Sequence, residues 1–150
     1  MARQTFCFVE LPLRAEQYGL KLTALANVPT HFYDEIMLGG DGRDRQIENM
    51  IYTIRNIAKA GIPIFGYNWM PSMVWRTTPK SIRCGALATA FDYEETKAMP
   101  FTHGHEYFEK EMWQKLEYWI NIITPVAEEE GIKLGIHPCD PPVEKLGGIP

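Results

Sequence analysis

Apolar side chains recur at helical spacing in two stretches of the chain. In residues 47–58 they are isoleucine, methionine and alanine, with charged side chains off that face. Between about residues 106 and 124 the same spacing is held by Phe108, Met112, Leu116, Trp119, Ile120 and Ile123. Both stretches predict amphipathic helices, and Pro125 is expected to kink or interrupt the second before residues 126–130 complete it. Residues 11–18, although too short to judge by period, are also predicted to be helical.

A weak internal repeat follows the predicted helices. Residues 19–29, 61–71 and 131–141 each begin with Gly, carry two aliphatic residues separated by one position, and reach a Pro ten residues after the Gly. Glycine suits the left-handed position just past a helix end, and the aliphatic residues suit a strand covered on both faces. The repeated order of helix, Gly, strand and polar loop predicts an α/β fold with a parallel sheet.

Polar residues stand where the predicted strands end. These are Asn27, Asn68 with Trp69, and residues 137–140. Ligands of parallel α/β folds gather at the carboxyl ends of the strands, so we expect the functional site there. The long segment 70–105 has little periodicity and many aromatic and basic residues, which favours an ordered loop that covers a substrate.

His137 is the candidate metal ligand of this region. It follows a predicted strand and stands three positions before Asp140, a pattern that suits a divalent-metal ligand beside a carboxylate that orients the ligand or faces the substrate. A metal site normally needs three or more protein ligands, and nothing nearby in the sequence supplies them. A structural histidine is therefore the open alternative. His103 and His105 precede a predicted helix in a Gly-containing turn, where a solvated turn is favoured over a metal pair.

Candidate substrate contacts lie in the same segments. The Asn68 amide could bind a hydroxyl or a carboxylate, and Arg76 could clamp a carboxylate. Trp69, Trp75 and Asp140 complete the predicted substrate-binding set. The alternatives are a turn-capping asparagine, a core tryptophan and a surface arginine.

Composition narrows the classes of protein. Of the 150 residues, 45% are hydrophobic and 23% are charged, the net charge is −4, and no run is long and apolar enough for a membrane span. No basic cluster favours nucleic acid as a partner. The cysteines Cys7, Cys84 and Cys139 form no C-x-x-C pair, so free thiols and a cytoplasmic location are expected.

A series of motifs along the chain resembles mannonate dehydratase. The motifs are Gly-Tyr-Asn-Trp-Met-Pro at 66–71, Val-Trp-Arg-Thr at 74–77, Arg-Cys-Gly-Ala at 83–86, Thr-Ala-Phe-Asp at 89–92, Pro-Val-Ala-Glu-Glu at 125–129, Gly-Ile-His-Pro-Cys-Asp-Pro-Pro at 135–142 and Leu-Gly-Gly-Ile at 146–149. The resemblance implies a xylose-isomerase-like TIM barrel that dehydrates the sugar acid D-mannonate to 2-keto-3-deoxy-D-gluconate with Mn²⁺ or Fe²⁺. It also implies a homo-oligomeric full-length enzyme. The family's metal ligands are two His, a Cys and an Asp, and His137 matches the first His.

The sequence departs from the family pattern in three respects. Cys139 stands where the family usually has Asp, and Cys84 stands where close relatives have Gly. A TIM barrel has eight strands and typically about 250 residues, whereas this chain has 150. We therefore expect residues 1–150 to form one partial barrel domain of about three βα units, truncated on the carboxyl-terminal side. The other metal ligands and the catalytic residues are then expected beyond residue 150, and the chain alone is expected to be inactive.

Two other functions fit the same residues. A sugar isomerase or epimerase would use the same barrel, a metal-bound sugar and proton abstraction next to a carbonyl. A non-catalytic α/β module would bind a sugar acid or a partner protein through the tryptophan-rich loop, and it would explain the short length without truncation.

Overall fold

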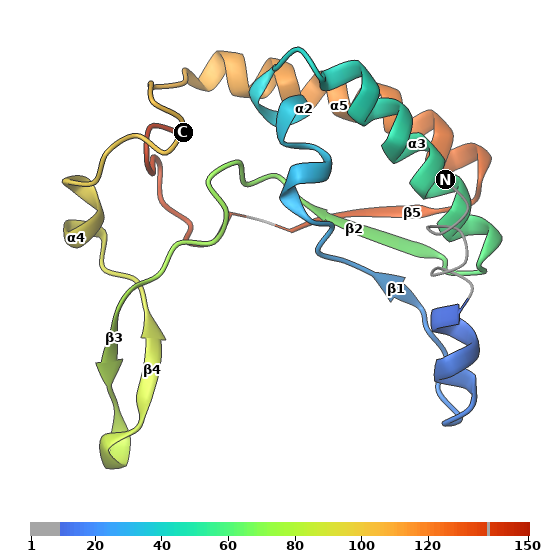
Figure 1. Ribbon diagram of the computed structural model, residues 1–150, viewed down its shortest axis with the longest axis horizontal. Coiled ribbons are helices and arrows are strands. Elements are labelled where there is room, and N and C mark those ends of the chain that lie inside the picture. Colours follow the sequence, from blue (N-terminus) through green and yellow to red (C-terminus); the bar gives the residue numbers. More distant parts are fainter. Residues whose placement is uncertain (1–9, 138) are drawn as a thin grey trace.

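A three-stranded parallel sheet forms the centre of the chain (Figure 1). The structure, a computed structural model, describes residues 10–137 and 139–150. The sheet has the order β1-β2-β5, with β1 at Ala24–Leu25, β2 at Ile64–Asn68 and β5 at Lys133–His137. Each pair of neighbours is parallel. The predicted α/β class and the three predicted strand segments are confirmed, although β1 is only two residues long.

The main helices lie together on one side of the sheet (Figure 1). They are α3 (Arg43–Lys59) and α5 (Glu109–Glu129). The short helix α2 (Asp34–Leu38), which follows the 3₁₀ helix η1 (Thr30–Phe32), packs against both. Residues 10–16 are also helical, so all three predicted helices are confirmed. None of the helices among the described residues is long and apolar enough to cross a membrane.

α5 continues through Pro125, so the helix is not interrupted there, and the alternative of a kink stays a prediction. A proline removes one backbone hydrogen bond and crowds the preceding turn, which weakens a helix locally. Here Trp119 and Ile123 before the proline, and Ala127 after it, are all buried against the core. Burial on both sides of Pro125 outweighs the lost hydrogen bond and holds the helix together.

Left-handed glycines end the helices that lead into the strands. Gly61 and Gly131 have φ of 73° and 68°, and Gly19 has φ of 69°. Ile62 and Ile132, which follow two of these glycines, donate backbone hydrogen bonds to carbonyls of the last helical turn, at 3.2 and 2.8 Å. This geometry satisfies the carbonyls that a helix end leaves unpaired. It is the physical basis of the sequence repeat.

The register of the sheet separates a covered face from an open one. Phe65 and Tyr67 of β2 are buried beneath the helices, and Leu134 of β5, paired with Phe65, packs against the same core. Side chains alternate between faces along a strand. Asn68 and His137, which pair with each other at the strand ends, therefore point from the opposite face.

The centre of the core is an aromatic cluster around Trp119. Its ring lies 5.6 Å from that of Tyr67 and 6.2 Å from those of Tyr33 and Trp69, measured between centroids. Trp119 and Tyr33 are fully buried. The cluster joins α5, β2 and the turn before α2 into one unit.

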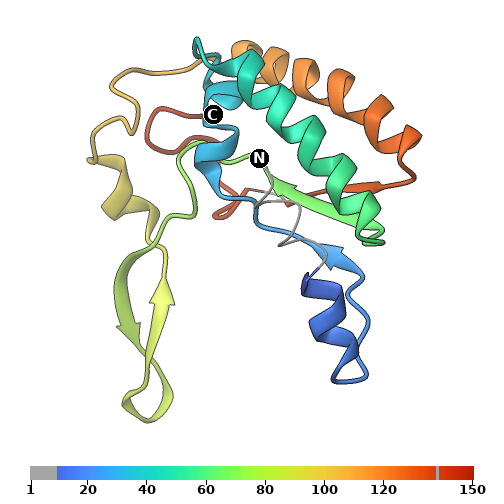
Figure 2. The ribbon, with the colours of Figure 1, turned by 45° about the vertical axis from the view of Figure 1, so that its right-hand side comes forward.

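Segment 70–105 contains an antiparallel hairpin that the sequence did not reveal. Strands β3 (Thr77–Ser81) and β4 (Leu87–Ala90) flank the 3₁₀ turn η2 (Arg83–Gly85), and the short helix α4 (Tyr93–Lys97) follows. The hairpin extends away from the helices and from the ends of the main sheet (Figures 1 and 2). The segment is ordered as predicted. Its hairpin does not cover the strand ends (Figures 1 and 2).

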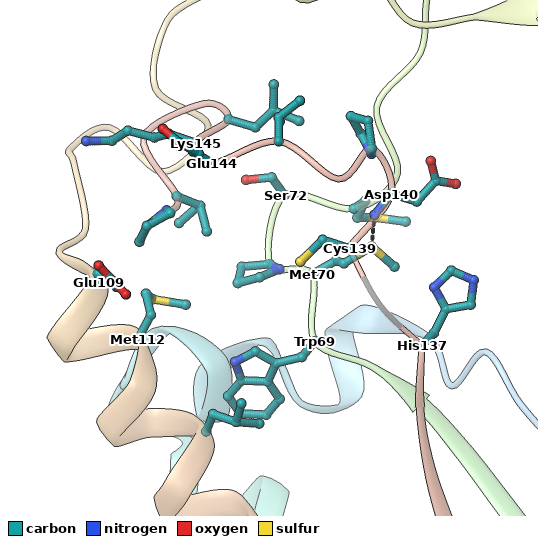
Figure 3. A pocket seen from close by; sticks show the side chains of 18 of the residues that line it. Trp69, Met70, Ser72, Glu109, Met112, His137, Cys139, Asp140, Glu144 and Lys145 are labelled. Atoms are coloured by element: carbon teal, nitrogen blue, oxygen red, sulfur yellow. Dashed lines mark hydrogen bonds between the residues drawn. The ribbon is translucent and has the colours of Figure 1, made fainter.

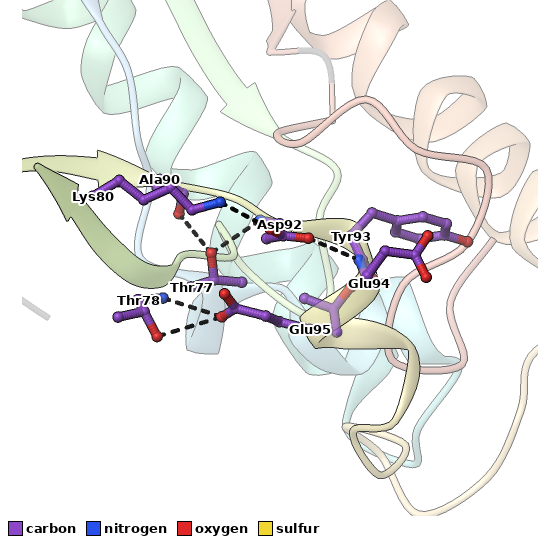
Figure 4. A network of polar contacts seen from close by, with 9 residues as sticks. Thr77, Thr78, Lys80, Ala90, Asp92, Tyr93, Glu94 and Glu95 are labelled. Atoms are coloured by element: carbon purple, nitrogen blue, oxygen red, sulfur yellow. Dashed lines mark hydrogen bonds and ion pairs between the residues drawn. The ribbon is translucent and has the colours of Figure 1, made fainter. Parts of the chain in front are cut away.

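Polar contacts fasten α4 to the base of the hairpin (Figure 4). The Asp92 side chain accepts a hydrogen bond from the backbone N–H of Glu94 and so caps α4, and it pairs with Lys80 Nζ at 2.8 Å. The Lys80 contact lowers the pKa of Asp92. Glu95 of α4 accepts hydrogen bonds from the backbone N–H and the hydroxyl of Thr78 in β3.

Candidate functional site

Asn68 and His137 stand side by side at the carboxyl ends of β2 and β5. They pair in register, so their side chains leave the same open face of the sheet. The backbone N–H of Asn68 donates to the Tyr33 hydroxyl at 3.2 Å. Burial raises the pKa of Tyr33, so its hydroxyl stays protonated and fixes the end of β2.

Arg76 and Asp140 bind each other directly. Arg76 Nη1 lies 3.2 Å from Asp140 Oδ1, and Nη2 lies 2.9 Å from Oδ2, which makes the contact bidentate. The hydrogen bonds from Arg76 lower the pKa of Asp140. The structure thus brings together two predicted substrate-binding residues and the predicted metal ligand. Arg76 is paired within the chain, so a ligand carboxylate would have to replace Asp140.

The two predicted tryptophans have different surroundings. Trp69 is largely buried and belongs to the aromatic core, which agrees with the core alternative, although it also lines a pocket. Trp75 is half-buried, and its indole N–H donates to the Ser72 carbonyl at 3.1 Å. Its ring lies close to Gly147, where an added Cβ would meet it at 2.9 Å. Ligand contact by either tryptophan stays a prediction.

A cavity of about 850 Å³ lies beside these strand ends (Figure 3). Its apolar wall includes Trp69, Met70, Met112 and Leu116, whereas His137 and Asp140 line its polar side. Asn68, Trp75 and Arg76 are not among its lining residues. The cavity therefore unites three of the six predicted site residues, and the other three lie outside it.

The described residues contain no complete metal site. No group of three or more His, Cys, Asp or Glu in 10–137 and 139–150 is arranged to hold a metal ion. The role of His137 as a metal ligand stays a prediction. His103 and His105 lie in a turn before α5, as predicted, and their rings pack against Tyr107.

Two residues that position the site escaped the sequence analysis. The Met70 sulfur accepts a hydrogen bond from the Asp140 backbone N–H at 3.2 Å (Figure 3). Tyr33 holds the Asn68 backbone, as described above. Tyr33 lies in a segment without a helical or strand period, so no pattern could have identified it. Met70 lies inside the motif at 66–71, but nothing in the motif indicated a contact with residue 140.

The cysteines agree with the expected free thiols where they can be described. Cys84 and Cys139 are free and exposed, and Cys7 lies outside the described residues. Cys139 also lines the cavity. It occupies the position at which the family resemblance leads one to expect Asp.

A family model described as D-mannonate dehydratase (UxuA) matches residues 9–106 and 100–150. The chain belongs to the mannonate dehydratase family. Mannonate dehydratases of Streptococcus suis strain 05ZYH33 and Streptococcus pneumoniae strain 70585 are each 34% identical to it over 165 residues, covering 93% of this chain and 44% of the relative. The crystal structure of mannonate dehydratase from Streptococcus suis serotype 2 superposes with a TM-score of 0.85 at 34% identity, covering 97% of this chain and 43% of that one.

These matches also show how much of the family's fold this chain contains. The chain spans less than half the length of the mannonate dehydratases it matches, and its parallel βα units form an incomplete TIM barrel. The alignment with the Streptococcus suis strain 05ZYH33 enzyme is 165 positions long, which exceeds the 93% of this 150-residue chain that takes part in it. That relative therefore has additional residues within the aligned region. The two segments matched by the family model meet at the turn that contains His103 and His105.

Proposed function

We propose that this chain forms the part of a D-mannonate dehydratase that carries one metal ligand and part of the sugar-acid site. The complete enzyme would convert D-mannonate to 2-keto-3-deoxy-D-gluconate and water. The observation that carries the proposal is the placement of His137 beside Asn68 on the open face of the sheet, next to the Arg76–Asp140 pair. Membership of the mannonate dehydratase family supports the substrate.

Arg76 is the proposed contact for the substrate carboxylate. A guanidinium binds a carboxylate through two parallel hydrogen bonds, and Arg76 already holds Asp140 in this way. Both side chains are partly exposed, so a sugar acid can approach and exchange with Asp140. The exchange would free a carboxylate close to His137. The Asn68 amide, on the same face as His137, would bind a sugar hydroxyl.

The dehydration removes a proton from the carbon next to the substrate carboxylate and expels the hydroxyl from the following carbon. The resulting enol becomes the 2-keto group, and one water is released. Mn²⁺ or Fe²⁺ is the proposed cofactor of the complete enzyme, with His137 as one ligand. The described residues contain no group of three or more possible metal donors, which leaves His137 as a single donor here. The proposal assigns the remaining donors and the catalytic acid and base to other parts of the barrel.

A product assay tests the proposal. The 150-residue chain alone, with D-mannonate and Mn²⁺ or Fe²⁺, is expected to show no turnover above a no-protein control. A full-length barrel made by joining residues 1–150 to the part of the Streptococcus suis relative that lies outside the match is expected to release a 2-keto-3-deoxy acid. His137→Ala in that barrel is expected to abolish the product. A folded, metal-loaded barrel that epimerises or isomerises the sugar acid would contradict the dehydratase assignment.

A further inference from the structure

The β3–β4 hairpin projects from the helices and the main sheet, and its outer edges have no strand partner (Figure 2). β3 and β4 form a sheet of two strands, and neither pairs with a third strand among residues 10–137 and 139–150. Most of its side chains are exposed, including Ile82 at 54% and Leu87 at 75%. A two-stranded hairpin is only marginally stable in water by itself, so a further strand beside it would stabilise it.

The two outer edges of the hairpin differ in how well they are protected against a further strand. β3 contains Pro79, which lacks the N–H that a neighbouring strand would bind, and Lys80, whose charge opposes edge-to-edge pairing. β4 has the sequence Leu-Ala-Thr-Ala, without a proline or a charge. The polar contacts that fasten α4 to the hairpin go to Thr78 and Lys80 of β3, not to β4. The edge of β4 is therefore the one that is open to strand addition.

Opposite charges lie at the two ends of β4. The tip of the hairpin, residues 82–86, contains Arg83 and no acidic residue. Residues 91–95, which follow β4, contain Asp92, Glu94 and Glu95 and no basic residue. If two copies of β4 pair antiparallel about a two-fold axis, the tip of each copy lies beside the acidic residues of the other. Parallel pairing would instead place like charges together, which is destabilising.

The side chains along β4 favour one register for such a pair. Side chains alternate between the two faces of a strand, so Leu87 and Thr89 share a face that Phe91 continues. If Thr89 stands opposite Thr89 of a second copy, Leu87 of each copy lies opposite Phe91 of the other. Pairs of an aliphatic and an aromatic side chain stabilise adjacent antiparallel strands, and this register makes two of them.

We propose that the edge of β4, residues Leu87–Ala90, is a self-association surface at which a second copy of this chain adds its own β4 in antiparallel orientation. The product is a four-stranded sheet in the order β3-β4-β4-β3. Charge complementarity selects a second copy as the occupant, because the basic tip and the acidic residues of one copy match those of the other. The paired segment is short, so the dimer is expected to be weak and to form as the concentration rises.

This surface lies apart from the strand ends that carry His137 and Asn68 (Figures 1 and 2). The inference therefore goes beyond the proposed function and does not rest on it. Association can be measured without a metal, a sugar acid or turnover, so either proposal can fail while the other stands.

Disulfide trapping in the 150-residue chain tests the register. Cys7, Cys84 and Cys139 are first replaced by serine, and Thr89→Cys then places one thiol on the proposed two-fold axis. The matched control is Ser81→Cys, because Ser81 is also exposed but lies on β3, away from the axis. We expect Thr89→Cys to form a disulfide-linked dimer about tenfold faster or more, since only its thiols are held close together. Equal rates for the two variants would overturn the proposal.

An exchange of charges tests the complementarity. Analytical ultracentrifugation of the chain with its native cysteines under reducing conditions measures the dissociation constant of the dimer. Arg83→Glu and Glu94→Arg are each expected to raise it about threefold or more, because each places like charges together twice in the dimer. The double variant is expected to restore it. Glu94 also pairs with Lys97, but this pair is exposed and contributes little to folding.

Two results of this experiment would overturn the proposal. One is an unchanged chain that stays monomeric up to about 1 mM. The other is a dimer whose dissociation constant is the same in both single variants, which would place the contact on another surface. Circular dichroism shows whether each variant is folded, and the trapping experiment provides the answer if a charge variant is not.

Discussion

Arg76 and Asp140 lie 64 residues apart in the sequence and form a bidentate ion pair beside His137. The pair joins the start of the β3–β4 hairpin to the loop after β5. Two residues that the sequence suggested as independent substrate contacts are therefore each other's partners. A sugar acid that binds Arg76 would compete with Asp140, which couples ligand binding to the state of the Asp140 carboxylate.

The pH dependence of this pair can be predicted from its charges. Arg76 holds the pKa of folded Asp140 below its ordinary value. The pair therefore stabilises the folded chain above the ordinary carboxyl pKa, and this contribution is lost as the pH falls through the lowered pKa. Arg76→Gln is expected to raise the pKa of Asp140 towards its ordinary value in a carbon-13 NMR titration. Asp92, whose pKa is held low by Lys80, is the internal control and should not move.

The capping contact of α4 makes a second prediction, about the hairpin base. Asp92 both caps α4 and pairs with Lys80. Asp92→Asn is expected to keep the cap and lose the ion pair, whereas Asp92→Ala loses both. Amide hydrogen exchange in residues 93–97 should therefore be fastest in Asp92→Ala and intermediate in Asp92→Asn. Equal exchange in the two variants would mean that the cap does not hold the helix.

The aromatic core predicts a large difference between two tryptophans of the same helix. Trp119 is fully buried among aromatic rings, so Trp119→Ala is expected to lower the free energy of unfolding by about 3–5 kcal/mol. Trp113 is mostly exposed, and Trp113→Ala in the isolated chain should change it by less than about 0.5 kcal/mol. Urea unfolding followed by circular dichroism measures both. A similar loss in the two variants would contradict the packing of α5.

The left-handed glycines predict a contrast between two positions four residues apart in the sequence. Gly131 has φ of 68°, so Gly131→Ala is expected to cost about 1–2 kcal/mol of folding free energy. Gly135 lies in β5 with open space around it, so Gly135→Ala introduces neither a clash nor a left-handed residue. Thermal unfolding should show a lower melting temperature for Gly131→Ala alone. An equal decrease for Gly135→Ala would indicate that the open face is already filled.

The sequence determined the main elements and the edge of the sheet where the candidate site lies. Helical spacing identified α3 and α5 because one face of each helix must be buried. Glycine after each helix identified the turn into the strand because few other residues adopt a positive φ easily. Asn68 and His137 could be assigned to one edge because all strands of a parallel sheet end on the same side. Each of these signals is local, and so is each physical cause.

Tertiary structure alone decided which residues meet. The bond from the Asn68 N–H to Tyr33 spans 35 residues, and the Arg76–Asp140 pair spans 64, so no local period could report either. The β3–β4 hairpin was missed because its mostly exposed strands lack the apolar alternation that burial imposes. Whether Pro125 interrupts its helix depends on whether the core buries the helix on both sides of it. In each case the outcome depends on contacts between residues that are distant in the sequence. A local sequence pattern carries no information about the free energy of those contacts.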